Sequence, residues 1–201
     1  MSSQNNTNQL YPVFFRLDKL KMLIVGAGEV GEEKLHFILK SSPNANITIV
    51  APWAKPEVEE LIKKFPRNIV WVKRKVEQGD IGRNDLIISA TNFPAINKQV
   101  HTWAKMLGKI VNVADTPSLC DFYMGSIVTR GDLKVAISTN GKSPTFAKRF
   151  RQLLESILPN STERLILNLK TIRDHLKGDF EYKVNELNRI TDSLVAGTTK
   201  E

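Results

Sequence analysis

The stretch KMLIVGAGEVG, residues 21–31, decides the fold. Its mostly apolar start predicts a buried strand, and Gly26, Gly28 and Gly31 follow with GxGxxG spacing directly before a helical pattern. In this spacing Gly26 permits a tight turn, Gly28 the close approach of a pyrophosphate, and Gly31 close packing of helix on strand. The pattern predicts a dinucleotide at the helix N-terminus. The alternative is a tight strand-to-helix turn without a ligand.

Strand and helix patterns alternate on both sides of this loop. β-Branched and other apolar runs predict strands, and apolar residues at helical spacing predict helices. The expected strands are Val13–Leu17, Lys21–Val25, Ile47–Val50, Ile69–Val72, Leu86–Ala90 and Ile110–Val113, and the expected helices are Glu29–Lys40, Glu57–Phe65 and Ala95–Leu107. This alternation indicates an α/β fold with a Rossmann-like parallel sheet and crossover helices.

The alternation stops after Asp115. Two strand patterns, Tyr123–Thr129 and Leu133–Ser138, predict an antiparallel hairpin, and a helix with an apolar face is expected from Ser143 to Leu158. Two more helices follow, the last with apolar positions from Phe180 to Leu194. We therefore expect a Rossmann-like domain at 1–115, a small strand and helix module at 116–158, and a C-terminal helical part at 159–201.

Composition narrows the class of protein. The 201 residues are 41% hydrophobic and 25% charged, as expected for a globular protein that needs no disulfides. The single cysteine, Cys120, cannot form an intramolecular disulfide, so the cytoplasm is expected. The opening MSSQNNTNQL has neither the basic nor the apolar part of a signal peptide, and no apolar run is long enough to cross a bilayer.

The net charge of +8 suits an acidic ligand, an anionic membrane surface or nucleic acid. The charge is +5 over residues 1–115, +3 over 116–158 and zero over 159–201, so the chain has no basic tail. The absence of an interleaved basic and aromatic strand pattern argues against nucleic acid. An ordinary solvated basic surface remains an alternative.

One element of the dinucleotide pattern is missing. About 20 residues after the glycines a carboxylate normally holds the ribose 2′-hydroxyl, but Val50, Ala51, Pro52 and Trp53 stand there. No arginine offers a partner for a 2′-phosphate at that point either. We therefore expect NAD rather than NADP, with the backbone of Ala51 and Pro52 as the contact.

Several strings carry a resemblance to one family. They are KMLIVGAGEVGEEK from Lys21, SATN from Ser89, NVADTP from Asn112, FYMGSIV from Phe122 and VAISTNGKSPTFAKRFRQLLESILP from Val135. Together, over roughly residues 11 to 195, they resemble the precorrin-2 dehydrogenase and sirohydrochlorin ferrochelatase family, which is also the N-terminal region of siroheme synthases. The resemblance implies NAD-dependent oxidation of precorrin-2 to sirohydrochlorin, in some members followed by insertion of ferrous iron. It also implies a homodimer, in which the 1–115 domain binds NAD and the 116–158 module serves dimerisation and substrate binding.

The resemblance also implies individual residues. The essential family aspartate before a proline matches Asp115, the candidate general base. Family contacts to the cofactor match Gly28, Glu29 and Val30 in the first loop. Further contacts match Ala51 and Pro52 after the second strand of the sheet, and Thr91 and Asn92 after the fourth. From the residues alone, Asp115 and Thr91 lie at the carboxyl ends of parallel strands, where open α/β sheets bind ligands. Asp115 could instead serve only the turn before Pro117.

The substrate and the metal are treated separately. A tetrapyrrole edged by carboxylates suits the helix start at Lys142 and Ser143 with the following Lys148 and Arg149, although these cations could be a solvated helix face. His36, His101 and His175 fall on three separate predicted helices without metal-ligand spacing, so metal ligands are not identified. Lone Cys120 is expected to act as a small buried residue.

Three readings of the function remain open at this point. Dehydrogenation and chelation could share one site, or a dehydrogenase could work beside a separate chelatase. A non-catalytic NAD-sensing module would keep the glycine loop but would need no acid at position 115. No segment is left over for a methyltransferase domain, so this chain is not expected to make precorrin-2 itself.

Overall fold

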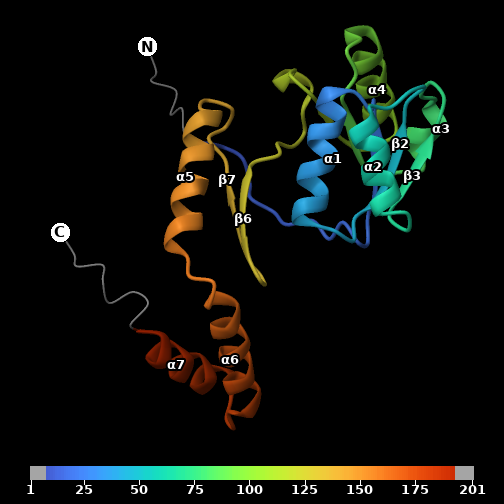
Figure 1. Ribbon diagram of the computed structural model, residues 1–201. Coiled ribbons are helices and arrows are strands. Elements are labelled where there is room, and N and C mark those ends of the chain that lie inside the picture. The colour runs from blue at the N-terminus through green and yellow to red at the C-terminus, as the bar shows by residue number, and fades with distance from the viewer. Residues whose placement is uncertain (1–7, 193–201) are drawn as a thin grey trace, which may run out of the picture. The chain divides into compact units, whose positions relative to one another are not determined.

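The computed structural model describes residues 8–192, and strands and helices alternate as far as β5 (Figure 1). The elements of the first part are β1 Lys21–Val25, α1 Glu29–Ser41, β2 Asn46–Val50, α2 Pro56–Lys64, β3 Ile69–Val72, α3 Gln78–Gly82, β4 Leu86–Ser89, α4 Pro94–Met106, β5 Ile110–Val113 and the 3₁₀ turn η1 Pro117–Leu119. They are followed by β6 Ser126–Arg130, β7 Leu133–Ile137, α5 Pro144–Ile157, α6 Thr162–His175 and α7 Phe180–Thr191.

The five-stranded sheet is parallel throughout and has the order β3-β2-β1-β4-β5. Its order reverses between β1 and β4, where Val25 lies opposite Ser89. In a doubly wound sheet, such a reversal leaves a crevice at the carboxyl ends of the two strands. The expected Rossmann-like α/β class is confirmed, and the glycine loop lies at this reversal because it directly follows β1.

The two faces of the sheet are covered by different helices. Alternate side chains of β1, including Met22 and Ile24, pack with Leu35 of α1 and Val58 of α2. The intervening side chains pack with α3 and α4 in a second cluster that contains Leu23, Val25, Ile81, Val100 and Ala104. Strands buried on both faces are continuously apolar, which explains the unbroken runs of the sequence.

The expected strand at Val13–Leu17 is wrong. No residue before β1 is in a strand in the described part of the chain, and Val13, Phe14 and Phe15 are exposed. No strand of the sheet pairs with this run, and β1, the strand that follows it, pairs with β2 and β4 instead. A turn also begins at Arg16, whose carbonyl accepts hydrogen bonds from the amides of Lys19 and Leu20.

The other predicted elements are present with small shifts of their ends. The largest shift is in the hairpin, whose first strand begins at Ser126 instead of Tyr123. The last predicted helix ends at Thr191, and Leu194, which the sequence assigned to it, lies outside the described residues. No helix of the described residues has the length and apolar character needed to cross a bilayer.

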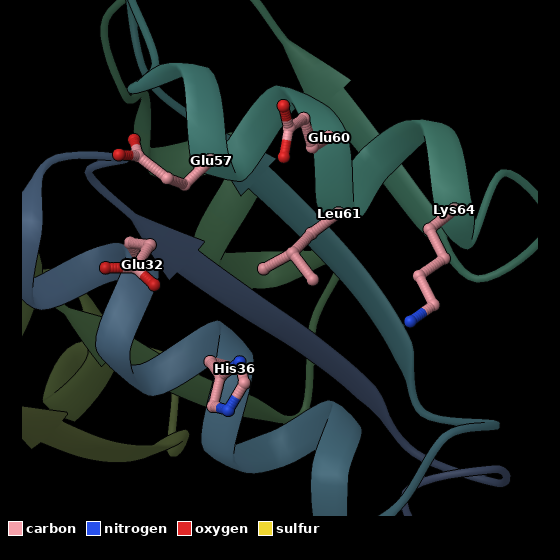
Figure 2. Close-up of a pocket in the computed structure, with 6 residues that line it drawn as sticks. All are labelled: Glu32, His36, Glu57, Glu60, Leu61 and Lys64. Atoms are coloured by element: carbon pink, nitrogen blue, oxygen red, sulfur yellow. The ribbon is translucent and has the colours of Figure 1, made fainter.

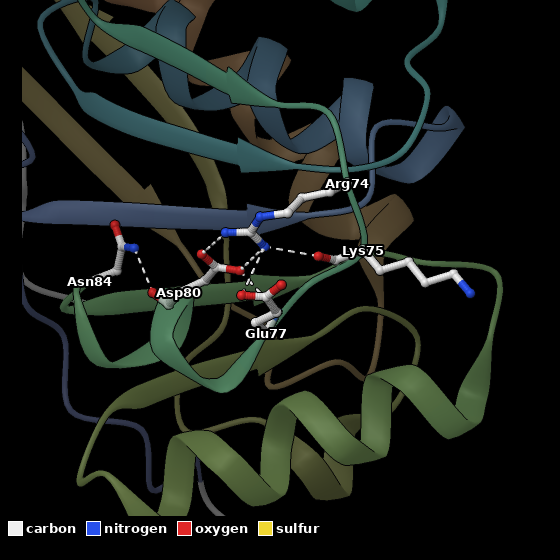
Figure 3. A network of polar contacts seen from close by, with 5 residues as sticks. All are labelled: Arg74, Lys75, Glu77, Asp80 and Asn84. Atoms are coloured by element: carbon white, nitrogen blue, oxygen red, sulfur yellow. Dashed lines mark hydrogen bonds and ion pairs between the residues drawn. The ribbon is translucent and has the colours of Figure 1, made fainter.

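The short helix α3 escaped the sequence patterns because a polar network holds it. Arg74 donates two hydrogen bonds to the carboxylate of Asp80, at 2.7 and 2.8 Å, and the side-chain amide of Asn84 donates to the carbonyl of Asp80 (Figure 3). The carboxylate also accepts from the amide of Glu77, which closes a capping box at the helix start. Five residues are too few to show an apolar period.

Replacing Asp80 with asparagine is expected to lower Tm by a few degrees at neutral pH, because the bidentate pair with Arg74 is lost. The hydrogen bonds from Arg74 hold the pKa of Asp80 below its usual value, against the opposite effect of burial. A lowered pKa stabilises the fold above the unfolded value of about 3.9, and this contribution disappears as the pH falls through the folded value. Thermal unfolding from pH 7 to 3 should therefore show the difference between the two proteins narrowing below about pH 4.

Contacts divide the chain into two compact units. The first ends at Gly125 and also includes Ser138–Pro144, and the second consists of Ser126–Ile137 and the chain from Thr145 onward. The expected division into segments 1–115, 116–158 and 159–201 stays a prediction.

The second unit combines the antiparallel β6–β7 hairpin with the three C-terminal helices. The guanidinium of Arg130, at the end of β6, donates to the carbonyls of Glu155 and Leu158 at 2.6 and 3.4 Å. These carbonyls lie at the C-terminal end of α5, where a cation and a donor are both favoured. The hairpin and α5 are thus joined by a polar contact.

Candidate functional site

Two glycines of the GxGxxG stretch, Gly26 in the loop after β1 and Gly31 in the first turn of α1, are required by the chain's own packing. Gly26 has a φ of +100°, and a Cβ at that position would lie 2.5 Å from the carbonyl oxygen of Ala90. A Cβ on Gly31 would overlap the carbonyl oxygen of Gly26. Positive φ and close backbone approach are the conditions under which only glycine fits. The turn and the packing of helix on strand therefore account for Gly26 and Gly31.

Gly28 is different, because nothing in the chain demands a glycine there. Its φ of −85° is open to any residue, and a Cβ would meet only the indole ring of Trp53, at 3.5 Å, which is ordinary contact. Gly28 is also the residue that caps α1, and no side chain of the described residues caps this helix start. The space beside Gly28, which a Cβ would fill, lies next to the uncapped backbone amides at the start of α1. This arrangement fits the pyrophosphate of a dinucleotide.

The loop after β2 lies against the glycine loop. The amide of Lys55 donates to the carbonyl of Ala27, and its ammonium forms an ion pair with Glu29 at 2.8 Å. Trp53 is 59% exposed beside Gly28. The predicted contact Ala51 has its amide bonded to Val72, and its carbonyl accepts the indole N–H of Trp71 at 3.0 Å. Of its backbone groups, only the second lone pair of that carbonyl remains for a ligand.

A cavity of about 390 Å³ opens at the carboxyl ends of β4 and β5. Its wall comes from α1, from the loop after β4 with the start of α4, and from the loop after β5. The lining residues are Val30, Ala90, Thr91, Asn92, Pro94, Asn97, Lys98, Ala114, Asp115, Thr116 and Leu119. The structure thus brings four predicted residues together in one cavity, namely Val30, Thr91, Asn92 and Asp115.

Buried Asn97 fixes the loop after β4. Its side-chain oxygen accepts from the hydroxyls of Thr91 and Ser89, at 2.7 and 2.9 Å, and its amide donates to the carbonyl of Thr91 at 2.9 Å. Ser89 is fully buried and Asn97 nearly so. Such a saturated network holds Thr91 in one orientation at the cavity wall. The sequence analysis missed Asn97.

Asp115 occupies an unusual backbone position. It has a φ of +58°, which for residues other than glycine is tolerated best by Asn and Asp. Its side chain is exposed, and within residues 8–192 it makes no hydrogen bond or ion pair. The turn is closed by the amide of Thr116, which donates to the carbonyl of Val113. No capping bond supports the reading of Asp115 as a turn residue only, so its carboxylate is available at the cavity.

Cys120 holds the base of the Asp115 loop. Its thiol donates to the carbonyl of Val113 at 3.1 Å and accepts from the amide of the same residue at 3.3 Å. Burial raises the pKa of this thiol above its usual value, so it stays protonated and can donate. Cys120 is half-buried, not fully buried as expected, and its thiol takes part in hydrogen bonds. It thus positions the loop that carries Asp115.

The residues predicted for the substrate divide between the two units. Lys142 and Ser143 belong to the first unit, in a turn where both of their amides donate to Thr139. Lys148 and Arg149 lie on α5 in the second unit and are exposed, and Arg149 donates to Gln152 at 3.2 Å. Their role in substrate binding stays a prediction.

The sequence analysis also missed Lys98. Pro94, Asn97 and Lys98 are spaced i, i+3, i+4 at the start of α4, so they share one helix face. All three line the cavity. The signal that could have found them is position, since the first turns of a helix that follows a parallel strand border the ligand edge of the sheet.

No metal site is found in the described part of the chain, where no three His, Cys, Asp or Glu side chains gather as ligands. The three histidines lie on α1, α4 and α6. A second cavity, of about 260 Å³, lies between α1 and α2 and contains His36 and three glutamates (Figure 2). Lys55 approaches two of these, Glu32 and Glu57, at 3.7 and 3.8 Å, and so offsets their charge.

Two family models and several curated proteins match this chain. A family model described as putative NAD(P)-binding matches residues 13–126, and one described as sirohaem biosynthesis protein central matches residues 130–157. Siroheme synthase of Vesicomyosocius okutanii is 32% identical over 94% of this chain, and that of a Psychrobacter species is 35% identical over 88%. The chain spans about two fifths of the length of these relatives, 40% and 38%.

A solved structure is similar over nearly its whole length. SirC, a precorrin-2 dehydrogenase, superimposes with a TM-score of 0.71 at 28% identity, and the match covers 90% of this chain and 89% of that one.

Proposed function

Because this chain belongs to the family of precorrin-2 dehydrogenases and siroheme synthases, we propose that it oxidises precorrin-2 to sirohydrochlorin with NAD as the acceptor. One observation carries the proposal. Asp115, an exposed carboxylate with no partner in residues 8–192, lines the same cavity as Val30, Thr91 and Asn92. A carboxylate at the ligand edge of a parallel sheet suits the removal of a proton from a bound substrate.

The residues have separate tasks in this reaction. Gly28 and the first amides of α1 bind the pyrophosphate, and Thr91 and Asn92 border the reacting end of the coenzyme. When bound, NAD⁺ accepts the hydride. The substrate loses one C–H electron pair with its hydrogen as hydride, and a second hydrogen leaves as a proton to a carboxylate oxygen of Asp115. The proton then passes to water, so the products are sirohydrochlorin, NADH and one proton.

The direct test is the purified chain with precorrin-2 and NAD. The proposal predicts that one NADH forms for each tetrapyrrole oxidised, measured as NADH absorbance together with the tetrapyrrole spectrum. Nucleotide binding without any NADH would instead support the NAD-sensing module. Faster turnover with NADP than with NAD would contradict the coenzyme assignment. That assignment rests on the lack of an arginine in the stretch from Val50 to Trp53.

Ferrous iron enters the proposal only as a second substrate. The described residues contain no cluster of His, Cys, Asp or Glu side chains that would support the assignment of a chelatase. The same assay separates the readings, because a bifunctional enzyme shifts the tetrapyrrole spectrum to that of siroheme when ferrous iron is added after oxidation. A rate no faster than that without protein would leave a dehydrogenase beside a separate chelatase.

We further infer a homodimer in the cytoplasm. In the described part of α5, α6 and α7, Ala147 is the single buried residue, whereas Phe146, Leu153 and Ile157 of α5 are more than half exposed. Apolar helix faces that one chain leaves uncovered favour a sister subunit. Light scattering at several concentrations measures the mass, and a monomer at micromolar concentration would contradict the proposed homodimer.

The proposed location in the cytoplasm rests on the lone cysteine, which is compatible with a reducing compartment.

A further inference from the structure

Lys98 is the one basic residue among those that line the Asp115 cavity, and Asp115 is the one acidic residue. Within residues 8–192 the ammonium of Lys98 makes no hydrogen bond or ion pair. Lys55, Arg74 and Lys105, in contrast, each have a carboxylate partner at 2.8 Å or less. The cavity is therefore lined by one positive side chain, Lys98, and one negative side chain, Asp115, and neither has an ionic partner within residues 8–192.

The position of Lys98 is set by the structure around it. Neighbouring Asn97 is locked to Ser89 and Thr91, which fixes the rotation of α4 about its axis at this point. The carbonyl of Lys98 also accepts the hydroxyl of Thr102 at 3.0 Å within the same helix. A lysine whose backbone is held while its ammonium has no partner is suited to binding an anion.

Two anions are candidates for this ammonium under the proposed function. The pyrophosphate of the coenzyme already has a cradle at Gly28, and Gly26 and Gly28 are not among the residues that line the Lys98 cavity. The remaining anion is the carboxylate edge of the substrate. An anionic substrate also needs an attraction that offsets its repulsion by Asp115.

We infer that Lys98 is a substrate-binding residue that pairs with a peripheral carboxylate of the tetrapyrrole and so positions the reacting edge against Asp115. This inference rests on the proposed function. Its substrate class is a flat polycarboxylate, and its role is positioning, because proton removal stays with Asp115.

The test compares Lys98→Met, Lys98→Arg and a matched control, Lys63→Met. Lys63 is an exposed lysine of α2 that does not line the cavity, so its replacement removes the same charge elsewhere. Lys98→Met is expected to raise the KM for precorrin-2 about tenfold, as for the loss of one charge-assisted hydrogen bond, without changing the KM for NAD. Lys98→Arg should restore most of the affinity, and Lys63→Met should behave like the wild type.

A second measurement does not need turnover. Sirohydrochlorin is titrated into the protein without NAD and followed by its absorbance, and Lys98→Met should raise its Kd by a similar factor of about ten. Added salt should weaken binding to the wild type more than binding to Lys98→Met. Unchanged tetrapyrrole binding in Lys98→Met would overturn the inference, and a raised KM for NAD alone would move Lys98 to the coenzyme. If the wild type forms no NADH, the proposed function fails, and this titration still decides the role of Lys98.

Discussion

Asp115→Asn is expected to lower the rate of NADH formation from precorrin-2 by about 10²- to 10⁴-fold, the usual contribution of a positioned general base. Asparagine is the sharpest replacement, because it tolerates the left-handed backbone of this position and differs from aspartate mainly in charge. Alanine would add backbone strain of about 1–2 kcal/mol and confuse a chemical effect with a structural one. Single-turnover kinetics measures the step directly.

The control for this change is Asp132→Asn, in the turn between β6 and β7, which lies outside the cavity-lining set. It should turn over at the wild-type rate. Asp115→Asn itself should keep the wild-type Tm and the wild-type Kd for NAD. A turnover within about twofold of the wild type would remove Asp115 from the mechanism, since no general base contributes so little.

Gly28→Ala should weaken NAD binding and Gly31→Ala should destabilise the fold, although the chemical change is identical. Gly28→Ala leaves the chain unstrained but fills the cradle at the start of α1, so the affinity for NAD should fall about tenfold or more, which corresponds to about 1.4 kcal/mol. Gly31→Ala drives a methyl group into the Gly26 carbonyl and should destabilise the fold by about 1–3 kcal/mol. Helix propensity alone would predict a gain of about 1 kcal/mol at a helical position.

Calorimetric titration with NAD and thermal unfolding without it separate the two effects. Gly28→Ala should unfold within about 2 °C of the wild type, and Gly31→Ala at a clearly lower temperature. A large loss of stability in Gly28→Ala, with no specific loss of NAD binding, would mean that the loop is only a turn. Gly26→Ala provides a second structural control, because its positive φ and the Ala90 carbonyl both oppose a side chain.

The parallel sheet could be predicted because its strands carry their own signal. In β4, for example, Leu86, Ile87 and Ile88 place apolar side chains on both faces of the sheet, and the helices between the strands show a clear apolar period. The same rule failed at Val13–Leu17, because an apolar run becomes a strand only where a neighbour offers hydrogen bonds. It also missed α3, which is held by the polar network around Asp80.

Residues of the candidate site could be predicted where they lie at a glycine turn or at the end of a strand. The glycines and the ends of β4 and β5 are visible in the sequence, which is why Thr91 and Asp115 could be placed at one edge. Asn97 and Lys98 could not be predicted, because their position at the cavity depends on how α4 is rotated about its axis. That rotation is fixed by the hydrogen bonds of Asn97 with Ser89 and Thr91. The separate roles of Gly28 and Gly31, in contrast, could already be predicted from the GxGxxG spacing.

The left-handed backbone at Asp115 limits which amino acids can evolve there. Glycine, asparagine and aspartate fit the geometry easily, and of these three only aspartate can take up a proton. In a library of all twenty residues at this position, selection for thermal stability should retain glycine, asparagine and aspartate. Selection for turnover should retain aspartate alone. Glutamate, the other acid, would suit the chemistry but not the turn, so loss of activity by drift should leave folded chains with asparagine or glycine.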